Sequence, residues 1–146
     1  MPEGLGRLFN VVPAAAGTLI SLKDAAGVTF VVTATTATET FTLKSAATYN
    51  GSATNMTTIT RDYTCTSQAG AAAWTDSGDI TAVNNIAVAA GSAGAFYVDS
   101  SDLPAGAEYV ELVVSGSGTA TVTAILHDEL AQRGPANLRV LSGSTS

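Results

Sequence analysis

Hydrophobic and polar residues alternate along much of the chain, and helical periodicity is almost absent. Val28, Phe30 and Val32 fall on one side of such a segment, and Thr29 and Thr33 lie on the other side. Threonine suits an exposed strand position because its branched β-carbon fits the pleat while its hydroxyl faces water. The same alternation recurs in segments 40–44, 58–65, 109–114 and 121–126. The pattern therefore predicts β-strands.

Turn signals rich in glycine, asparagine and aspartate separate these segments. They lie at residues 24–27, 50–51, 76–79, 91–94 and 116–118. Short strands joined by frequent turns predict an all-β protein with at most a stray turn of helix. We expect a single-domain antiparallel β-sandwich or barrel-like fold of about eight strands.

The two chain ends lack a sustained strand pattern. We expect an N-terminal arm at 1–15, a β-sandwich domain at 16–127, and a C-terminal arm with a flexible tail at 128–146. An apolar tail that completes no sheet needs a surface to lie on, either its own domain or a neighbouring subunit. The expected partner-contacting residues of the arms are Leu5, Leu8, Phe9, Leu130, Arg133, Pro135, Leu138 and Arg139.

Composition narrows the possible partners. Only 12% of the residues are charged, which is about half the usual share. The net charge is -6 with only 6 lysines and arginines, so nucleic-acid binding is not expected. No apolar stretch approaches the roughly 18 residues that a membrane-spanning helix needs. Low charge suggests a surface partly covered by other subunits, although alanine also raises the mean hydropathy while burying little.

Titratable residues offer little chemistry. His127 lies beside Asp128 and Glu129, but no second histidine exists to complete a metal site. The pairs Asp76/Asp79 and Asp99/Asp102 supply two carboxylates each, whereas calcium prefers six to eight oxygen ligands. Such residues in turns more often bond the local backbone. We therefore expect no catalytic residue, no metal and no cofactor.

Cys65 is the single cysteine and cannot form an intramolecular disulfide. The alternation in 58–65 places it on one strand face with Ile59, Arg61 and Tyr63, in the position of a small buried hydrophobe. The N-terminus lacks the pattern of a signal peptide, so we expect synthesis and retention in the cytoplasm until assembly.

Aromatic residues raise a second possibility. Exposed aromatic faces on a β-sandwich can stack on sugar rings. Most of the aromatic residues here are expected in the core or at an interface. Trp74 follows a flexible run at 70–73 and is the best single candidate for an exposed contact, and Tyr97 is a second residue for such a site.

Four segments carry a resemblance to a known family. They read FTLKSAATYNG at 41–51, AWT at 73–75, LPAGAEYVEL at 103–112 and AILHDELAQRGPANL at 124–138. In these short segments, and without a defined catalytic motif, the chain resembles the small structural proteins encoded beside the major capsid protein in tailed phages of actinobacteria.

The resemblance implies a non-enzymatic virion protein, a capsid decoration or cement protein. Such proteins bind the major capsid protein on the outer capsid face and commonly form trimers or other oligomers. The implied location is the capsid surface of the virion, after synthesis in the host cytoplasm. Two alternatives remain open: a head–tail connector or tail protein of the virion, and a glycan- or receptor-binding β-sandwich module with Trp74 or Tyr97 in its site.

Overall fold

The computed structural model describes residues 11–14, 17–69, 71–81 and 85–127. This part of the chain is almost entirely β-structure, with one 3-10 turn, η1(Ser100–Asp102), as its helical element. The strands are β1(Val11–Pro13), β2(Ile20–Ser21), β3(Gly27–Ala34), β4(Glu39–Ala46), β5(Thr54–Asn55), β6(Thr58–Cys65), β7(Trp74–Thr81), β8(Asn85–Val88), β9(Ser92–Asp99), β10(Tyr109–Ser115) and β11(Ala120–His127). The predicted all-β class is confirmed. The described residues contain more strands than the predicted eight, and β1, β2 and β5 among them are only two or three residues long.

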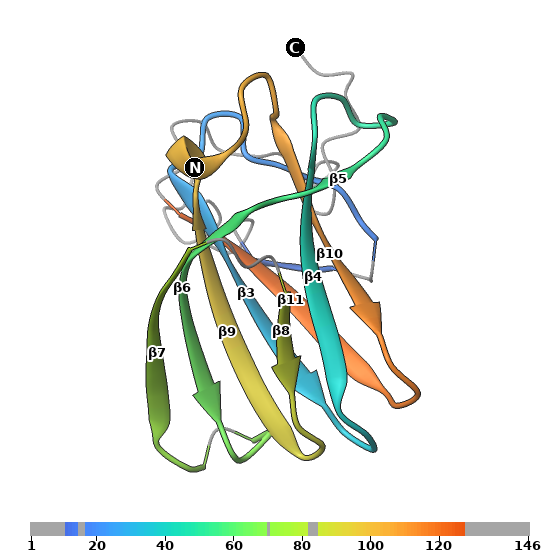
Figure 1. Ribbon diagram of the computed structural model, residues 1–146, viewed down its shortest axis with the longest axis vertical. Coiled ribbons are helices and arrows are strands. Elements are labelled where there is room, and N and C mark those ends of the chain that lie inside the picture. The colour runs from blue at the N-terminus through green and yellow to red at the C-terminus, as the bar shows by residue number, and fades with distance from the viewer. Residues whose placement is uncertain (1–10, 15–16, 70, 82–84, 128–146) are drawn as a thin grey trace, which may run out of the picture.

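The strands form two antiparallel sheets that face each other (Figure 1). The six-stranded sheet has the order β1-β11-β3-β9-β6-β7. The five-stranded sheet has the order β2-β10-β4-β5. The fifth strand, β8, also pairs with β4, at residues 39–42, whereas β5 pairs with it at residues 44–45. Only the β4–β5 and β6–β7 connections stay within one sheet, and every other connection between consecutive strands crosses to the opposite sheet. The result is the predicted sandwich-like fold.

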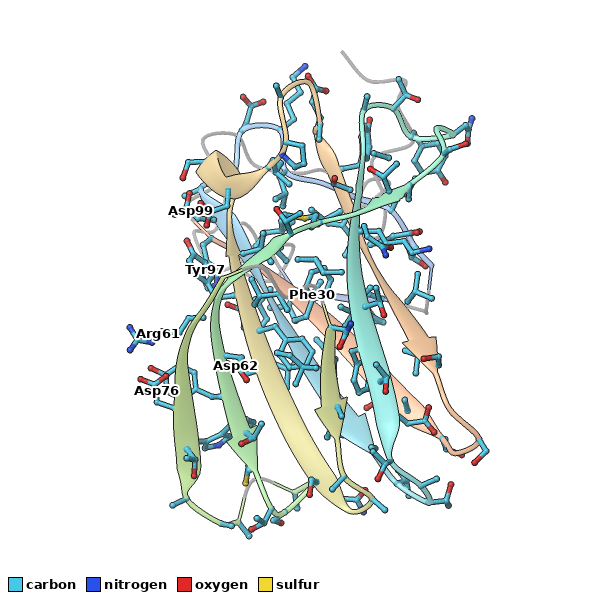
Figure 2. All side chains as sticks on the ribbon, viewed as in Figure 1. Phe30, Arg61, Asp62, Asp76, Tyr97 and Asp99 are labelled. Carbon is cyan, nitrogen blue, oxygen red and sulfur yellow. The ribbon has the colours of Figure 1, made fainter. Side chains whose placement is uncertain are left out.

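The core fills the space between the two sheets. In β3, Val28, Phe30 and Val32 are buried while the residues between them are partly exposed, as the alternation predicts. Phe30 lies between the layers in Figure 2. The rings of Phe41 and Phe96, from opposite sheets, are 5.9 Å apart and tilted by 57°. This is a favourable aromatic arrangement.

Strand β6 departs from its prediction. Its pairing with β7 shifts register between Ile59 and Asp62, and again between Asp62 and Tyr63. The first shift places an extra residue in β6 and reverses which face its following side chains occupy, whereas the second places an extra residue in β7. Ile59 is therefore buried in the core, whereas Arg61 and Tyr63 are exposed on the outside. The expectation that these residues share one face was wrong.

Three predicted turns lie partly or wholly in strands. Residues 76–79 are in the middle of β7, residues 92–94 of the turn 91–94 are in β9, and Gly27 of the turn 24–27 begins β3. Strand β7 is an edge strand, where aspartate, serine and glycine are tolerated because one side of the backbone has no strand beside it in the described sheet. Gly94 is required by a close approach, since a β-carbon there would lie 2.9 Å from the Phe96 ring.

The end of the predicted N-terminal arm forms a strand. Val11–Pro13 pairs with Thr123 to Ile125 of β11, which makes β1 an edge of the six-stranded sheet. Proline is accommodated at such an edge because it cannot donate a ladder hydrogen bond.

Among the described residues, no helix has the length and apolar character to cross a membrane.

A buried carboxylate joins the β3–β4 turn to the β10–β11 turn. Glu39, the first residue of β4, is buried, and its Oε1 accepts a hydrogen bond of 2.5 Å from the Gly118 backbone N–H. A β-carbon at Gly116 would overlap the same carboxylate, and the positive φ of 154° also favours glycine there. The Thr119 N–H donates to the Thr36 hydroxyl at 3.2 Å across the same junction.

Candidate functional site

The contact residues predicted from the sequence lie outside the described residues. Leu5, Leu8 and Phe9 belong to 1–10, and Leu130, Arg133, Pro135, Leu138 and Arg139 belong to 128–146. Their assignment as contacts stays a prediction. The structure brings together a different set of side chains, on the outer face of the six-stranded sheet.

The centre of that outer face carries no charged side chain. The register aligns residues of β11, β3 and β9 in rows, and paired residues point to the same side. We call this surface the β11–β3–β9 face. It consists of Thr121, Thr123, Ile125, Thr29, Val31, Thr33, Ala93, Ala95 and Tyr97. Most of these side chains are half-buried.

Threonine hydroxyls on this face bond to neighbours within the sheet. The Thr33 and Thr121 hydroxyl oxygens are 2.5 Å apart across the β3–β11 pair. The Thr29 hydroxyl oxygen lies 2.6 Å from Nε2 of His127. Hydrogen bonds inside the sheet reduce the need of these hydroxyls for water, so covering the face costs less desolvation energy than the residue types suggest.

The outer face of the five-stranded sheet differs. Lys44 of β4 and Glu111 of β10 are directly paired in its ladder, so opposite charges stand at its centre. Half-buried Thr42 lies one step along the same face, opposite Val113. The two outer surfaces of the sandwich are thus chemically distinct, one uncharged at its centre and one charged.

A cluster of polar groups closes one end of the β11–β3–β9 face. The Tyr97 ring crosses Gly27, where an added β-carbon would lie 2.8 Å from the Tyr97 hydroxyl. The same ring meets the His127 ring edge-on, with 5.6 Å between centroids. The Tyr97 hydroxyl donates to Asp99 at 3.3 Å. Glycine at position 27 therefore makes room for the aromatic ring between His127 and Asp99.

Asp99 caps the short η1 turn. The Ser101 backbone N–H and hydroxyl donate to its Oδ1 at 2.9 and 2.8 Å. The Ser101 backbone N–H holds the pKa of Asp99 below its usual value, the Ser101 and Tyr97 hydroxyls add to this effect, and burial partly opposes it. The carboxylate has a local structural role, as expected for the Asp99/Asp102 pair.

Of the other carboxylate candidates, Asp76 has a local partner. Asp76 binds Arg61, and the Asp79 side chain lies outside the described part of the structure. Asp128 and Glu129 lie outside it too, so the predicted cluster around His127 is described only at its histidine. Within the described ranges, no group of three or more histidine, cysteine, aspartate or glutamate side chains is placed to hold a metal ion.

Cys65 is buried, which confirms its predicted environment. Its Sγ donates to the backbone carbonyl of Ala72 at 3.3 Å, in the loop before β7. The thiol nevertheless points to the outer side of the sheet, because the bulge in β6 sets Cys65 on the same side as Arg61 and Tyr63. The loop, not the core, covers it.

Exposed aromatic residues gather at the β6–β7 edge of the same outer surface. Trp74 is 41% exposed and Tyr63 is 36% exposed. Tyr63 pairs with Asp76 and Cys65 pairs with Trp74, so the two aromatic residues are diagonal neighbours on one side. Trp74 was the best candidate for an exposed contact, but the core was the preferred expectation for it, and its exposure corrects that expectation. Tyr63 was not singled out, because its neighbours depend on the register of the β6–β7 hairpin.

An ion pair stands beside these rings. The Arg61 guanidinium donates to both carboxylate oxygens of Asp76, through Nη2 at 2.6 Å and Nε at 3.3 Å. The guanidinium carbon is 6.0 Å from the centroid of the Tyr63 ring. Both charged side chains project from the outer side of β6 and β7, away from Phe30 in the core (Figure 2). We call Trp74, Tyr63, Arg61 and Asp76 the aromatic platform.

A hollow of about 430 Å³ opens at the side of the sandwich near the β10–β11 turn and adjoins the β11–β3–β9 face at Thr121. It is lined by Pro13, Ala14, Val114, Gly118, Ala120, Thr121 and Val122. This lining contains no ionisable group, so the hollow offers no acid, base or metal ligand for a reaction.

Comparisons of the chain with protein-family models, curated proteins and solved structures find no match.

Proposed function

We propose that this protein is a non-enzymatic structural subunit that attaches to other protein subunits through the β11–β3–β9 face. Following the sequence resemblance, we propose that it decorates the outer surface of a phage capsid and binds the major capsid protein there. The observation that carries the proposal is the uncharged, half-buried centre of one outer sheet face, whereas the outer face of the opposite sheet has charges at its centre.

The physical basis is the cost of desolvation. Charged residues are depleted at the centres of protein interfaces because removing a charge from water is expensive. The β11–β3–β9 face has none at its centre, and Thr29, Thr33 and Thr121 bond within the sheet. A partner could cover this surface without stripping water from an ion.

The size of the face argues for additional contacts. Three strands of eight residues make a surface of about 27 by 14 Å, or about 400 Å². A stable interface buries about 800 Å² on each partner. The face alone is too small by about half. The chain ends would add contact area when they order on binding. Repeated weak contacts around a symmetric shell would further strengthen attachment by raising the effective concentration.

A charge introduced on the face tests the proposal. Thr123→Lys places an ammonium group in the central row of the β11–β3–β9 face, and Thr42→Lys places the same group at a half-buried threonine of the opposite outer face. Capsids stripped of this protein are mixed with each variant and sedimented. Thr123→Lys is expected to lower the bound fraction at least tenfold, and Thr42→Lys to retain it. Equal binding by both variants would exclude this face as the attachment surface.

Copy number separates the decoration role from its alternative within the virion. Mass spectrometry of purified particles is expected to find this chain in numbers comparable to the capsid protein. A handful of copies per particle would instead identify a head–tail connector or tail protein. We further propose a trimer in solution, for which sedimentation equilibrium gives the mass.

A further inference from the structure

We propose that the aromatic platform binds a neutral saccharide. The inference does not depend on the proposed attachment to a capsid, since none of the four platform side chains belongs to the β11–β3–β9 face, although Arg61 is paired with Tyr97 of that face. It assigns a ligand class to the four side chains Trp74, Tyr63, Arg61 and Asp76.

The two aromatic rings provide the apolar half of the site. Tyr63 and Trp74 lie on neighbouring strands, and diagonal neighbours in an antiparallel pair are about 7–8 Å apart. Sugar rings present a flat face of C–H groups that packs against such rings. Trp74, Tyr63 and Val11 are the large hydrophobic side chains that the described surface leaves exposed, and two of the three are together here.

The ion pair provides the polar half. Sugar hydroxyls both donate and accept hydrogen bonds, and Arg61 and Asp76 place N–H donors and carboxylate oxygens at one point of the surface. The bidentate hydrogen bonding between the guanidinium and the carboxylate fixes the orientation of both side chains before a ligand binds. Less conformational entropy is therefore lost on binding.

Charge favours a neutral ligand. Arg61 and Asp76 neutralise each other, so the platform has no net charge to attract an anionic group. The chain as a whole carries -6, which disfavours sialylated or sulfated glycans further.

The exposure of the ion pair favours a saccharide over a protein partner. Tryptophan, tyrosine and arginine are also frequent at the centres of protein interfaces. The side chains of Arg61 and Asp76, however, are 47% and 38% exposed, and a protein covering them would have to remove their water. Sugar hydroxyls can take the place of water as hydrogen-bond partners of both side chains, so covering the ion pair with a saccharide costs less desolvation energy.

The test is binding of the full-length protein to an array of neutral and acidic glycans, followed by titration with the best neutral glycan. Trp74→Ala and Tyr63→Ala are each expected to lower affinity at least tenfold, and Trp74→Phe to retain part of it. The matched control is Val11→Ala, which trims another exposed hydrophobic residue, 45% exposed on β1 at the opposite edge of the sheet. Its affinity is expected to be unchanged. Far-UV circular dichroism and the urea midpoint verify folding of each variant.

A second variant tests the charge argument. Asp76→Asn removes the negative charge that pairs with Arg61, and the preference is expected to move toward acidic glycans by at least tenfold relative to the neutral ones. An unchanged preference would contradict the role assigned to the ion pair.

Three outcomes would overturn the proposal. The first is no binding to any neutral glycan at millimolar concentration. The second is glycan binding that Trp74→Ala and Tyr63→Ala leave intact. The third is loss of capsid attachment in these variants without any glycan binding, which would make the platform a protein contact. Thr123→Lys is expected to keep full glycan affinity, so failure of the capsid proposal is distinguishable from failure of this one.

Discussion

At the scale of single residues, Gly27 determines how the polar end of the β11–β3–β9 face is built. A β-carbon there would lie 2.5 Å from the Val98 carbonyl oxygen and 2.9 Å from the Tyr97 ring. Its absence lets the tyrosine cross the strand and contact His127 and Asp99. An aromatic ring lying over a glycine is a known way to protect backbone that lacks a side chain.

Asp99 makes the stability of this end depend on pH. Its pKa is lowered in the folded protein by hydrogen bonds from Ser101, so its contribution to stability is present above the unfolded value of about 3.9. That contribution is lost as the pH falls through the lower folded value. Asp99→Asn is therefore expected to reduce the free energy of unfolding at pH 6 and to have little effect near pH 2, measured by urea titration. A difference that stays constant with pH would contradict this role for the carboxylate.

At the scale of elements, strand β3 separates core from surface by single steps along the chain. Phe30 is fully buried between the sheets, while its neighbour Val31 lies half-buried on the outer face. The two residues have the same strand neighbours, β9 and β11. Their side chains lie on opposite sides of the sheet, Phe30 toward the core and Val31 toward the outer face.

Truncating these neighbours should have unequal effects. Phe30→Ala is expected to lower the free energy of unfolding by about 3–5 kcal/mol, because it leaves a cavity in the core. Val31→Ala is expected to cost less than about 1 kcal/mol, since it removes only partly covered methyl groups. Urea denaturation of both variants measures the difference. A similar loss in both would show that the outer face is covered as fully as the core.

The Glu39 carboxylate is expected to stabilise the two turns that it joins. Glu39→Ala removes the acceptor of the Gly118 N–H and leaves a buried void, for a loss of about 2–4 kcal/mol. Glu39→Gln keeps an oxygen acceptor in nearly the same volume and should lose less than half as much. Thermal or urea unfolding provides the comparison. Equal losses would assign the effect to the charge and not to the hydrogen bond.

Alternation along the chain predicts much of the sandwich, and its failures have physical causes. It identifies β3, β4, β10 and β11 because one side of each strand packs in the core. It misjudges β6, where the bulges shift the pattern, and β7, whose Asp76 to Asp79 composition resembles a turn. A strand at a sheet edge is under weaker selection for alternating hydrophobic residues.

The sequence predicted the candidate sites less well than it predicted the fold. Trp74 was a candidate for an exposed contact because it follows a run of small residues, although the core was the preferred expectation. Its neighbours in the platform, Tyr63, Arg61 and Asp76, depend on the pairing of β6 with β7 across the intervening loop. Local periodicity carries no information on that register. The β11–β3–β9 face likewise requires the strand order, which brings together segments about ninety residues apart.

At the scale of the whole molecule, the proposed functions divide among separate parts of the surface. The β11–β3–β9 face would attach the protein to other subunits, and the aromatic platform at the β6–β7 edge would hold a sugar. The outer face of the five-stranded sheet, with Lys44 and Glu111 at its centre, would stay in water. Such a division allows one outer surface to be covered while the opposite outer surface remains hydrated.

The predicted C-terminal arm can be tested at this scale. A chain ending at His127 keeps all the described strands, so its urea midpoint and m-value are expected to match the full-length protein within about 10–15%. Its attachment to stripped capsids should be weaker, because residues 128–146 include the expected contacts Leu130, Arg133, Pro135, Leu138 and Arg139. Co-sedimentation measures the loss. Unchanged attachment would remove the tail from the set of contacts.

The strand order also dictates when the protein can fold during its synthesis. Strand β3 leaves the ribosome early, yet both strands that flank it, β9 and β11, come from the last third of the described chain. At about 5–20 residues per second, β3 waits roughly 5–20 s for β11. Until β9 and β11 have been synthesised, β3 lacks the strands that flank it in the sheet. The sandwich domain therefore cannot close before β11 emerges.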